Sequence, residues 1–428
     1  MSGLWGGESL RLSGQGGTRE RRTTRQTRSR SRELPCRVVG RTRGIVLISA
    51  LGLALGVAVA SAPFRRAAAL VVRAAQIGGW FEAIARADAD RVLISPPTTF
   101  RSRYGAIPAQ VYEPSGRVRR TTLLIPGIHS MGIREPRLTA LASELAGSGV
   151  RVVTVALPDL TTYMITPRAT DVIEDAVSWT MTHTDWAPDG RVGIIGISFA
   201  GGLAVVAAGR DSIRDKVAYV VSFGGHGDLP RVMHYLATGD ERQVSGLHVV
   251  PPHDYGLAVL LYGLASGGIV PANQADGLRN AIATYLLASQ LTLVNTAQAN
   301  AAFAKARDMA AALPPPASTY MKYVNDRDVG KLGPAIAPFL SGLGTDSALS
   351  PMRTTSGLPS ARIYLLHGAE DSVIPTAESV LLGDYLREKG VDARVLVSTL
   401  ITHAEVDRSP AAGATWQLVA FWADVLRH

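Results

Sequence analysis

From about residue 101 onward, short runs of aliphatic and β-branched residues alternate with longer stretches in which apolar residues recur every three or four positions. The short runs predict buried strands at 109–112, 121–125, 150–156, 191–195 and 217–223. The longer stretches predict helices at 134–146, 169–182 and 198–208. The alternation returns near the carboxyl end, with strands at 361–366 and 393–398 and helices at 376–389 and 414–426. This order of elements predicts an α/β fold in which helices cover both faces of a mostly parallel central sheet.

The alternation is interrupted between residues 224 and 360. Ala- and Leu-rich stretches there, such as 255–264 and 278–312, predict helices with no strand between them. We interpret residues 224–360 as a helical cap inserted into the core, and the alternative is a run of helices that belong to the scaffold itself. The predicted core then consists of residues 101–223 and 361–428.

A second apolar feature precedes this core. Residues 44–64 carry no charge, and 21 residues extend about 31 Å as a helix, close to the thickness of the hydrocarbon core of a bilayer. Arginines flank the stretch unequally, with Arg37, Arg41 and Arg43 before it and Arg65 and Arg66 after it. The excess on the amino side predicts a membrane anchor with a cytoplasmic amino terminus and the carboxyl-terminal body of the chain on the non-cytoplasmic side.

Two other interpretations of residues 44–64 stay open. Ala60-Ser61-Ala62 has the small residues of a signal-peptide cleavage site, which would give an exported protein, although Pro63 fits the first mature position poorly. The segment could instead be a helix that packs on the protein. Residues 65–100 are predicted to form a helical linker to the core.

The charge of the chain is concentrated in its first 43 residues. The net charge is +9, and residues 1–43 contribute +8 of it because they hold eleven Arg and three Glu. This tail is too polar to bury a core and is predicted to be disordered. The remaining chain is almost neutral, so we expect no nucleic-acid partner. The single cysteine, Cys36, excludes an intrachain disulfide framework.

The strand predicted at 191–195 ends in a run typical of a nucleophile elbow, Gly196-Ile197-Ser198-Phe199-Ala200. Such a turn holds its serine in strained backbone at the tip of a strand, where the hydroxyl projects outward. Small residues are needed at positions 196 and 200 because the strand and the next helix pass very close to each other. Taken alone, the pattern also fits an ordinary turn in which Ser198 caps a helix.

Two possible partners of Ser198 follow later strands. Asp371 comes in the loop after 361–366, and His403 comes after 393–398. Functional groups in α/β sheets gather at the carboxyl ends of the strands, so these side chains are expected near each other. The pairing is chemically sensible because an imidazole can take the proton of a serine hydroxyl, and an ionised carboxylate fixes the imidazole in the required tautomer.

The order serine, acid, histidine resembles that of the α/β-hydrolase superfamily. The resemblance covers roughly residues 100–428, and its acid loop, His367-Gly368-Ala369-Glu370-Asp371-Ser372-Val373-Ile374-Pro375, is most similar to those of dienelactone-hydrolase-like and prolyl-oligopeptidase-like esterases. It implies a catalytic triad of Ser198, Asp371 and His403. Glu370 competes for the acid role, and the place in the loop favours Asp371. His367 is expected to be structural.

The resemblance also implies an oxyanion hole. The amide of Phe199 would supply one donor, and an amide of Ile128 or His129, in the loop after 121–125, would supply the second. The imidazole of His129 is expected to be structural. The chain departs from the family pattern at two points: Ala200 replaces the last glycine of the elbow, and the oxyanion loop lacks repeated glycines.

These features predict a serine hydrolase that cleaves a small-molecule carboxylic ester through an acyl-enzyme, with an apolar acyl group favoured by the Leu- and Ala-rich cap. The alternatives are an acyltransferase that uses the same triad, a peptidase or amidase, and a catalytically silent binding protein of this fold. No cofactor is predicted. No metal is predicted either, because the following polar residues match no common ligand spacing: His226, Asp228, His253 and Asp254.

Overall fold

The computed structural model describes residues 61–76, 78–241, 244, 247, 250–292, 294–402, 405–406 and 412–428. The chain divides into two compact units, Met1–Gly56 and Val57–His428, and all described residues belong to the second. The predicted basic tail, residues 1–43, and most of the predicted membrane segment, residues 44–64, lie outside the described residues. Within the described part of the chain, no helix is long and apolar enough to cross a membrane.

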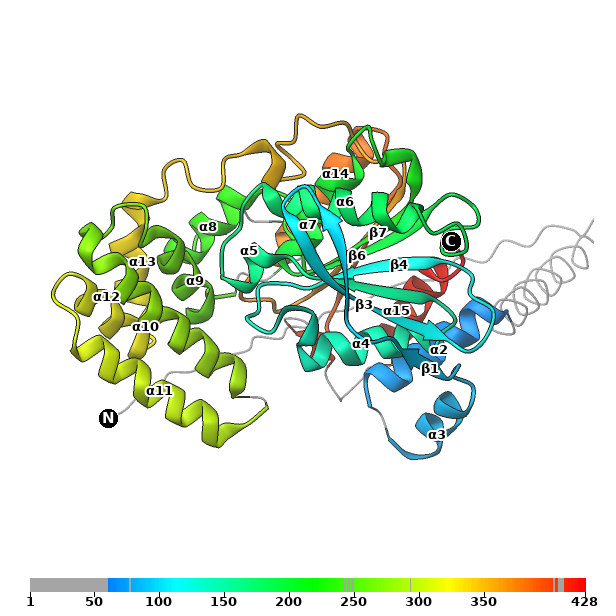
Figure 1. Cartoon of the computed structure of the whole chain (residues 1–428), viewed down its shortest axis with the longest axis horizontal. Helices are drawn as coiled ribbons and strands as arrows, with labels where there is room; N and C mark the ends of the chain where they lie inside the picture. Colours follow the sequence, from blue (N-terminus) through cyan, green and yellow to red (C-terminus); the bar gives the residue numbers. More distant parts are fainter. Residues whose placement is uncertain are drawn as a thin grey trace, which may run out of the picture. The chain divides into compact units, whose positions relative to one another are not determined.

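A nine-stranded mixed sheet forms the centre of the second unit (Figure 1). Its strands are β1 (Val92–Ile94), β2 (Thr98–Ser102), β3 (Gly105–Pro114), β4 (Thr121–Ile125), β5 (Arg151–Val155), β6 (Val192–Ile197), β7 (Val217–Phe223), β8 (Arg362–Gly368) and β9 (Ala393–Ser398). The order across the sheet is β1-β3-β5-β4-β6-β7-β8-β9, with β2 also paired to β3. The strands from β5 to β9 in this order are mutually parallel, and β3 runs antiparallel to β5.

Helices cover both faces of this sheet. One face carries α2 (Ala62–Ala74), α4 (Pro136–Ala146) and α15 (Ala412–Val425), and the other carries α6 (Arg168–Met181), α7 (Phe199–Ala208) and α14 (Thr376–Glu388). Neighbouring residues of a central strand face opposite cores: Leu123 packs in the core under α6 and α7, and Leu124 packs in the core under α4. The predicted α/β class, with a mostly parallel sheet between two helical layers, is therefore confirmed.

The central strands, β4 to β8, are mainly apolar because both of their faces are buried. All five residues of β4 and all five of β5 are buried. A strand that is covered on both sides cannot alternate between polar and apolar residues. The observed strands therefore agree closely with those expected from the apolar runs of the sequence, and β4, β7 and β9 have the expected bounds.

The stretch between residues 65 and 100 differs from the helical linker that the sequence predicts. It is helical only as far as the end of α3 (Gly79–Ala87), after which β1 and β2 add to the edge of the sheet. In β1 the burial pattern is intermediate, exposed, exposed, so this short edge strand has no buried face to give a period of two in the sequence.

Helix α2 begins inside the predicted membrane segment. Its first residue is Ala62, and the ring of Phe64 lies 4.9 Å from that of Trp416 in α15. At the other end of α2, the buried Arg73 donates to Glu144 Oε2 at 2.5 Å and to Ser148 Oγ at 3.0 Å. Residues 62–64 therefore belong to a helix that packs on the folded core.

The described residues between β7 and β8 form helices and their connections. The α-helices are α8 (Leu229–Thr238), α9 (Asp254–Leu264), α10 (Ala272–Leu291), α11 (Thr296–Ala311), α12 (Ala317–Asn325) and α13 (Val329–Ile336). Four of them begin at a polar residue whose side chain accepts a hydrogen bond from the first turn, namely Asp228, His253, Asn295 and Asp328. Helices α9 to α13 form a group beside the sheet (Figure 1), and we call α8 to α13 the cap.

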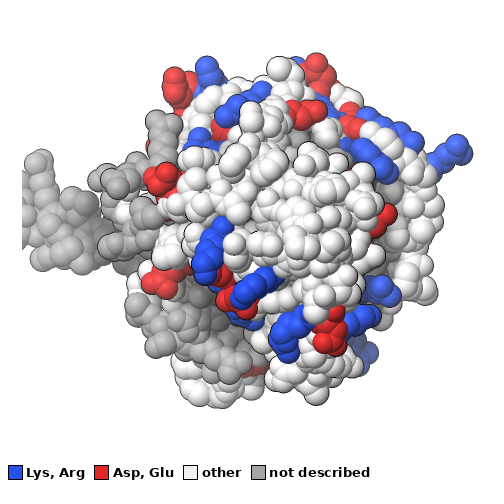
Figure 2. Space-filling model, turned by 90° about the vertical axis from the view of Figure 1, so that its left-hand side faces the viewer, with Lys and Arg blue, Asp and Glu red and all other residues white. Residues whose placement is uncertain are grey.

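The cap side of the molecule shows no concentration of one charge. In Figure 2, which turns this side toward the viewer, acidic and basic side chains lie mostly toward the rim and the centre carries few of either. Helix α11 illustrates this composition, since its 16 residues include Lys305, Arg307 and Asp308 among many alanines.

Candidate active site

Ser198 occupies a strained turn between β6 and α7. Its φ of 54° and ψ of −133° are rare for a residue with a side chain. The surroundings fix this conformation, because the Ser198 amide donates to Phe223 O at 2.7 Å and the Ser198 carbonyl accepts from the Gly201 amide at 2.8 Å. The turn has the geometry expected of a nucleophile elbow, with the serine between the end of a strand and the start of a helix.

The close approach that this turn requires falls on Gly196 and Gly201. A Cβ on Gly196 would lie 2.3 Å from the carbonyl oxygen of Ala200, and a Cβ on Gly201 would lie 2.4 Å from Ser222 Oγ. Ala200 itself is fully buried in the core. The departure from the family pattern at Ala200 is therefore accommodated, because the backbone of residue 200, rather than its methyl group, faces the strand at Gly196.

The predicted oxyanion loop lies against Ser198. β4 pairs with β6, so the loop that leaves β4 emerges beside the elbow. A Cβ on Gly127 would lie 3.1 Å from Ser198 Cβ and 3.2 Å from Ile197 O. Ile128, His129 and Phe199, the predicted sources of oxyanion amides, line the same cavity as Ser198. The loop and the elbow are thus close enough for their amides to face one reacting group.

The imidazole of His129 is held in its neutral form. Its Nδ1 accepts a hydrogen bond from the Met131 amide at 3.2 Å. The pKa of His129 is lowered to about 4, chiefly by burial; the negative charge of Glu135 opposes this shift, and the positive charge of Arg137 adds to it. A neutral ring that accepts a backbone hydrogen bond has the structural role that the sequence predicts for this histidine.

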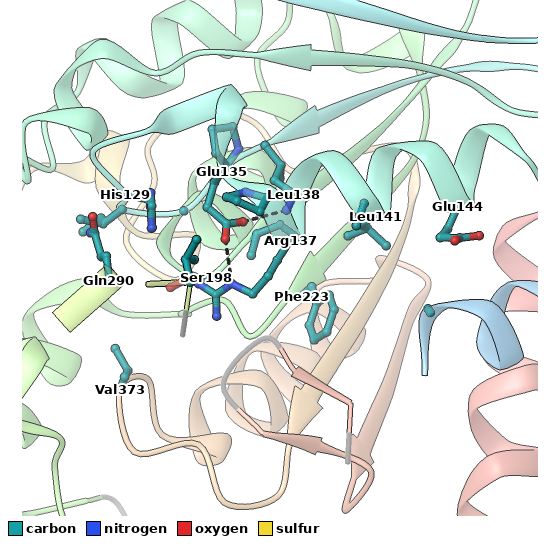
Figure 3. Close-up of a pocket in the computed structure, with 18 of the residues that line it drawn as sticks. His129, Glu135, Arg137, Leu138, Leu141, Glu144, Ser198, Phe223, Gln290 and Val373 are labelled. Atoms are coloured by element: carbon teal, nitrogen blue, oxygen red, sulfur yellow. Dashed lines mark hydrogen bonds and ion pairs between the residues drawn. The ribbon is translucent and has the colours of Figure 1, made fainter. Parts of the chain in front are cut away.

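Glu135 and Arg137 form an ion pair beside His129 (Figure 3). Arg137 Nε donates to Glu135 Oε1 at 2.8 Å, and the other carboxylate oxygen accepts from the Leu138 amide at 2.7 Å, which caps α4. Burial alone would raise the pKa of Glu135, but these hydrogen bonds and the charge of Arg137 outweigh it and hold the pKa below its usual range. The pair gives the cavity a polar wall.

The loop after β8 buries Asp371. Its Oδ1 accepts from the amides of Val373 at 2.9 Å and Ile374 at 3.0 Å, and only 2% of the residue is exposed. The neighbouring Glu370 is exposed. Val373, two residues further along the same loop, lines the cavity that contains Ser198. Asp371 rather than Glu370 is therefore the carboxylate that this loop holds in place near the serine.

His367 is fully buried and supports the acid loop. Its Nε2 donates to Ile374 O at 2.9 Å, and its Nδ1 is hydrogen-bonded to the Ser379 hydroxyl at 2.7 Å. Nε2 also lies 3.4 Å from Asp371 Oδ2. These contacts tie the end of β8 to α14 and to the loop, and they fit the structural role expected of His367.

His403, the predicted general base, lies outside the described residues. In sequence it falls between β10 (Ile401–Thr402) and β11 (Glu405–Val406), which pair as a short antiparallel ribbon. β10 lies against β8, the strand that leads to Asp371. β6 leads to the elbow, β7 to Gly224 and β8 to the acid loop, and β9 precedes β10 and His403. These four strands are neighbours in the sheet and run in the same direction.

A cavity of about 820 Å³ opens over Ser198. Figure 3 shows Gln290 and Val373 on one side of Ser198 and Leu141 and Glu144 on the other. Its apolar lining includes Ala74, Ala75, Leu138, Leu141, Ile197, Phe223 and Val294. Helices α9 and α10 of the cap also contribute side chains to it. The cavity is large enough for a small organic molecule that reaches from the serine along α4.

The residues considered as possible metal ligands each have a different role. His226 Nε2 donates to Leu349 O at 2.7 Å in the core. Asp228 caps α8 and accepts from Arg353 at 2.7 Å, and His253 caps α9. Asp254 accepts from the Tyr285 hydroxyl. In the described part of the chain, no group of three or more potential ligands converges.

Sequence reasoning missed two cap residues that line the cavity, Tyr255 and Gln290. Both contact the oxyanion loop by hydrogen bonds described below. Tyr255 lies in the mainly apolar α9, whereas Gln290 is one of several polar residues of α10. The partner of each lies more than 100 positions away in the chain. A polar residue in a predicted cap helix could mark such a contact, but the sequence alone could not have named the partner.

The sheet order, the elbow after β6 and the acid loop after β8 together constitute the α/β-hydrolase fold that the sequence motifs indicate. No protein-family model matches the chain, and no curated protein sequence matches it.

Several solved structures are similar to this chain at low sequence identity. One is an esterase from the archaeon Pyrobaculum calidifontis, with 16% identity over 85% of this chain and 90% of that one and a TM-score of 0.40. A thermostable esterase from Pseudomonas putida ECU1011 has 13% identity over 85% and 96%, with a TM-score of 0.43. An acylaminoacyl peptidase from Pyrococcus horikoshii has 13% identity over 82% and 43%, with a TM-score of 0.41.

Proposed function

We propose that the protein is a serine hydrolase that cleaves a carboxylic ester, with Ser198 as nucleophile, His403 as general base and acid, and Asp371 as the carboxylate that orients His403. The observation that carries the proposal is the strained backbone of Ser198 at the edge of an 820 Å³ cavity. Strain of this kind costs about 1–3 kcal/mol and persists where the surrounding structure imposes it, which is common at active sites. The buried Asp371, held by two amides near the same cavity, supports the assignment.

The reaction proceeds in two halves. Ser198 Oγ attacks the carbonyl carbon while His403 takes its proton, and the negative charge on the carbonyl oxygen is stabilised by the amide of Phe199 and an amide of the oxyanion loop. Collapse of this intermediate breaks the ester bond, and His403 returns the proton to the departing alcohol. Water then attacks the acyl-enzyme and loses a proton to His403. Collapse of the second intermediate releases the carboxylic acid, and His403 returns this proton to Ser198 Oγ.

The lining of the cavity supports an apolar acyl group in the substrate. Leu138 and Leu141 of α4 line the cavity together with Ala74 and Ala75. From residue 137 to residue 144, α4 advances about 10 Å, roughly the length of a medium acyl chain. We therefore expect hydrolysis of p-nitrophenyl hexanoate or octanoate to be more efficient, as kcat/KM, than hydrolysis of the acetate.

A fluorophosphonate probe tests the proposal directly. Attack by Ser198 Oγ forms an O–P bond and releases fluoride, so the full-length protein should carry the label on the peptide that contains Ser198. Ser198→Ala should abolish labelling, and Asp371→Asn should slow ester hydrolysis by about 10³–10⁴-fold. Ser212→Ala, which changes a surface serine hydrogen-bonded to Glu174, is the matched control and should label normally. A folded wild-type protein that stays unlabelled would show that the proposed function is wrong.

A further inference from the structure

A chain of hydrogen bonds connects the cap to the loop beside Ser198. Ser130, in the oxyanion loop, donates its hydroxyl to Gln290 Oε1 at 2.7 Å, and its amide points to the same oxygen at 3.4 Å. Gln290 Nε2 donates to the Tyr255 hydroxyl oxygen at 2.8 Å. The Tyr255 hydroxyl donates to Ile128 O at 3.3 Å. Two residues of the cap, one in α9 and one in α10, are thus bonded to both ends of a three-residue stretch of the loop.

The direction of each bond in this chain is determined by chemistry. The Ser130 amide can only donate, so the Gln290 atom that faces it is the oxygen and the amide nitrogen faces Tyr255. The Gln290 nitrogen can only donate, so the Tyr255 oxygen accepts and its hydrogen is available for Ile128 O, which can only accept. Burial raises the pKa of Tyr255, as does the nearby Tyr163, so its phenol keeps this hydrogen throughout the working pH range.

The bond to Ile128 O also fixes the direction of the His129 amide. The carbonyl of residue 128 and the N–H of residue 129 belong to one planar trans peptide and point in opposite directions. When Tyr255 holds the carbonyl toward the cap, the His129 N–H is turned away from the cap helix. Gly127, which precedes Ile128 in the loop, lies close to Ser198, since a Cβ on Gly127 would be 3.1 Å from Ser198 Cβ.

We propose that Tyr255 and Gln290 are positioning residues, which hold the Ile128–His129 peptide so that the His129 N–H serves as the second oxyanion donor. The inference rests on the proposed hydrolase function and adds to it a role for the cap. The active site is complete only when α9 and α10 are seated on the oxyanion loop. Between the two candidate amides in this loop, the geometry selects that of His129.

The role predicts a specific kinetic signature. A misaligned oxyanion donor weakens binding of the transition state and leaves binding of the ground-state ester almost unchanged. Loss of an oxyanion donor costs about 10²–10³-fold in kcat, and a donor that is present but poorly oriented should cost less, about 10- to 100-fold. Tyr255→Phe and Gln290→Leu should each show this fall in kcat with KM within about twofold of the wild type.

The experiment measures p-nitrophenyl ester hydrolysis by the full-length protein and its inhibition by an alkyl trifluoromethyl ketone. Ser198 Oγ adds to this ketone and turns its carbonyl oxygen into an oxyanion, with the serine proton passing to His403. The inhibition constant should rise in Tyr255→Phe and Gln290→Leu by the same factor as kcat/KM falls. Inhibition by the carboxylic acid product, which forms no oxyanion adduct, should not change. The kcat of the double variant should be at most about twofold lower than that of the less active single variant, because both residues act through one chain of bonds.

Two matched controls keep the test specific. Tyr262→Phe removes a phenol from the same helix, α9, and Gln298→Leu changes an exposed glutamine in α11; neither residue lines the cavity. Both should retain wild-type kcat, and thermal unfolding should show that all variants are folded. An unchanged kcat in Tyr255→Phe and Gln290→Leu, or a rise in KM alone, would overturn the positioning role. Labelling of the wild type at Ser198 would in that case still support the proposed hydrolase function. A wild type without labelling or turnover would overturn both.

Discussion

At the scale of single residues, the site combines positions that the sequence signals with positions that it does not. Ser198 and Asp371 are predictable because each stands in a local motif: the elbow needs a small residue at Gly196, and the acid loop turns its own amides back onto Asp371. Tyr255 and Gln290 stand in no motif, because what makes them important is a contact with a loop far away in the chain. Spacing along the sequence cannot encode that contact.

The neutral state of His129 leads to a prediction about acid stability. Its pKa is about 4 in the folded protein, below the ordinary value of 6.5, so between these values the unfolded chain binds more protons than the folded one. The free energy of unfolding therefore falls as the pH drops from about 6.5 toward 4, by at most about 1.4 kcal/mol per pH unit for this group. His129→Asn should reduce this slope, since an asparagine oxygen can still accept from the Met131 amide but does not titrate.

Urea unfolding of both proteins at pH 7.5, 6 and 5 measures the effect. Near pH 7.5 the two should differ little in their dependence on pH, because His129 is neutral in both the folded and the unfolded state. The buried His226, whose pKa burial also lowers, contributes equally to both proteins and cancels in the comparison. Parallel curves from pH 7.5 to pH 5 would contradict the burial argument for His129.

At the scale of elements, the central strands were predictable and the edge was not. β4 and β7 are largely buried on both faces, so their apolar runs give a clear signal, and β9 gives a similar run although it is only half-buried. β1 and β2 are short edge strands that the sequence does not mark. In the cap, one helical stretch was expected at 278–312, and Asn295 divides it because its side chain caps a new helix at Gln298 N.

The elbow gives a prediction at this scale, through Ala200. The tight approach between β6 and α7 involves the backbone of residue 200, so the methyl group of Ala200 is not a source of strain. Ala200→Gly should leave kcat and fluorophosphonate labelling unchanged. It should lower the free energy of unfolding by about 1 kcal/mol, because glycine is that much less favourable than alanine inside a helix.

Gly201→Ala is the contrasting variant. Its Cβ would meet Ser222 Oγ at 2.4 Å and Gly225 Cα at 3.0 Å, so the helix would have to move away from β7. It should lower the unfolding midpoint and the labelling rate of Ser198 together, because overpacking in a buried contact typically costs about 1–3 kcal/mol. A rise in kcat on replacing Ala200 by glycine would instead show that the methyl group distorts the elbow.

At the scale of the whole molecule, an apolar segment precedes the folded body in the chain. Because α2 already occupies residues 62–64, the part of the predicted anchor that precedes this helix is residues 44–61. Eighteen residues extend about 27 Å as a helix, still close to the thickness of a hydrocarbon core. We propose that this segment anchors the protein, with Arg37, Arg41 and Arg43 on the cytoplasmic side and the catalytic body on the other.

The anchored arrangement predicts two outcomes for the full-length protein in cells. After a carbonate wash, which removes peripheral proteins, the protein should stay in the membrane fraction at its full length. Protease added to the non-cytoplasmic side should digest the body only when the protein is unfolded by heat, and an epitope ahead of residue 44 should stay protected until the membrane is permeabilised. Because α2 follows the segment directly and packs on α15, little chain is left between the membrane and the fold for a protease to cut. A shortened soluble protein that begins at Pro63 would show instead that the segment is a cleaved signal, with α2 then starting at the new amino terminus.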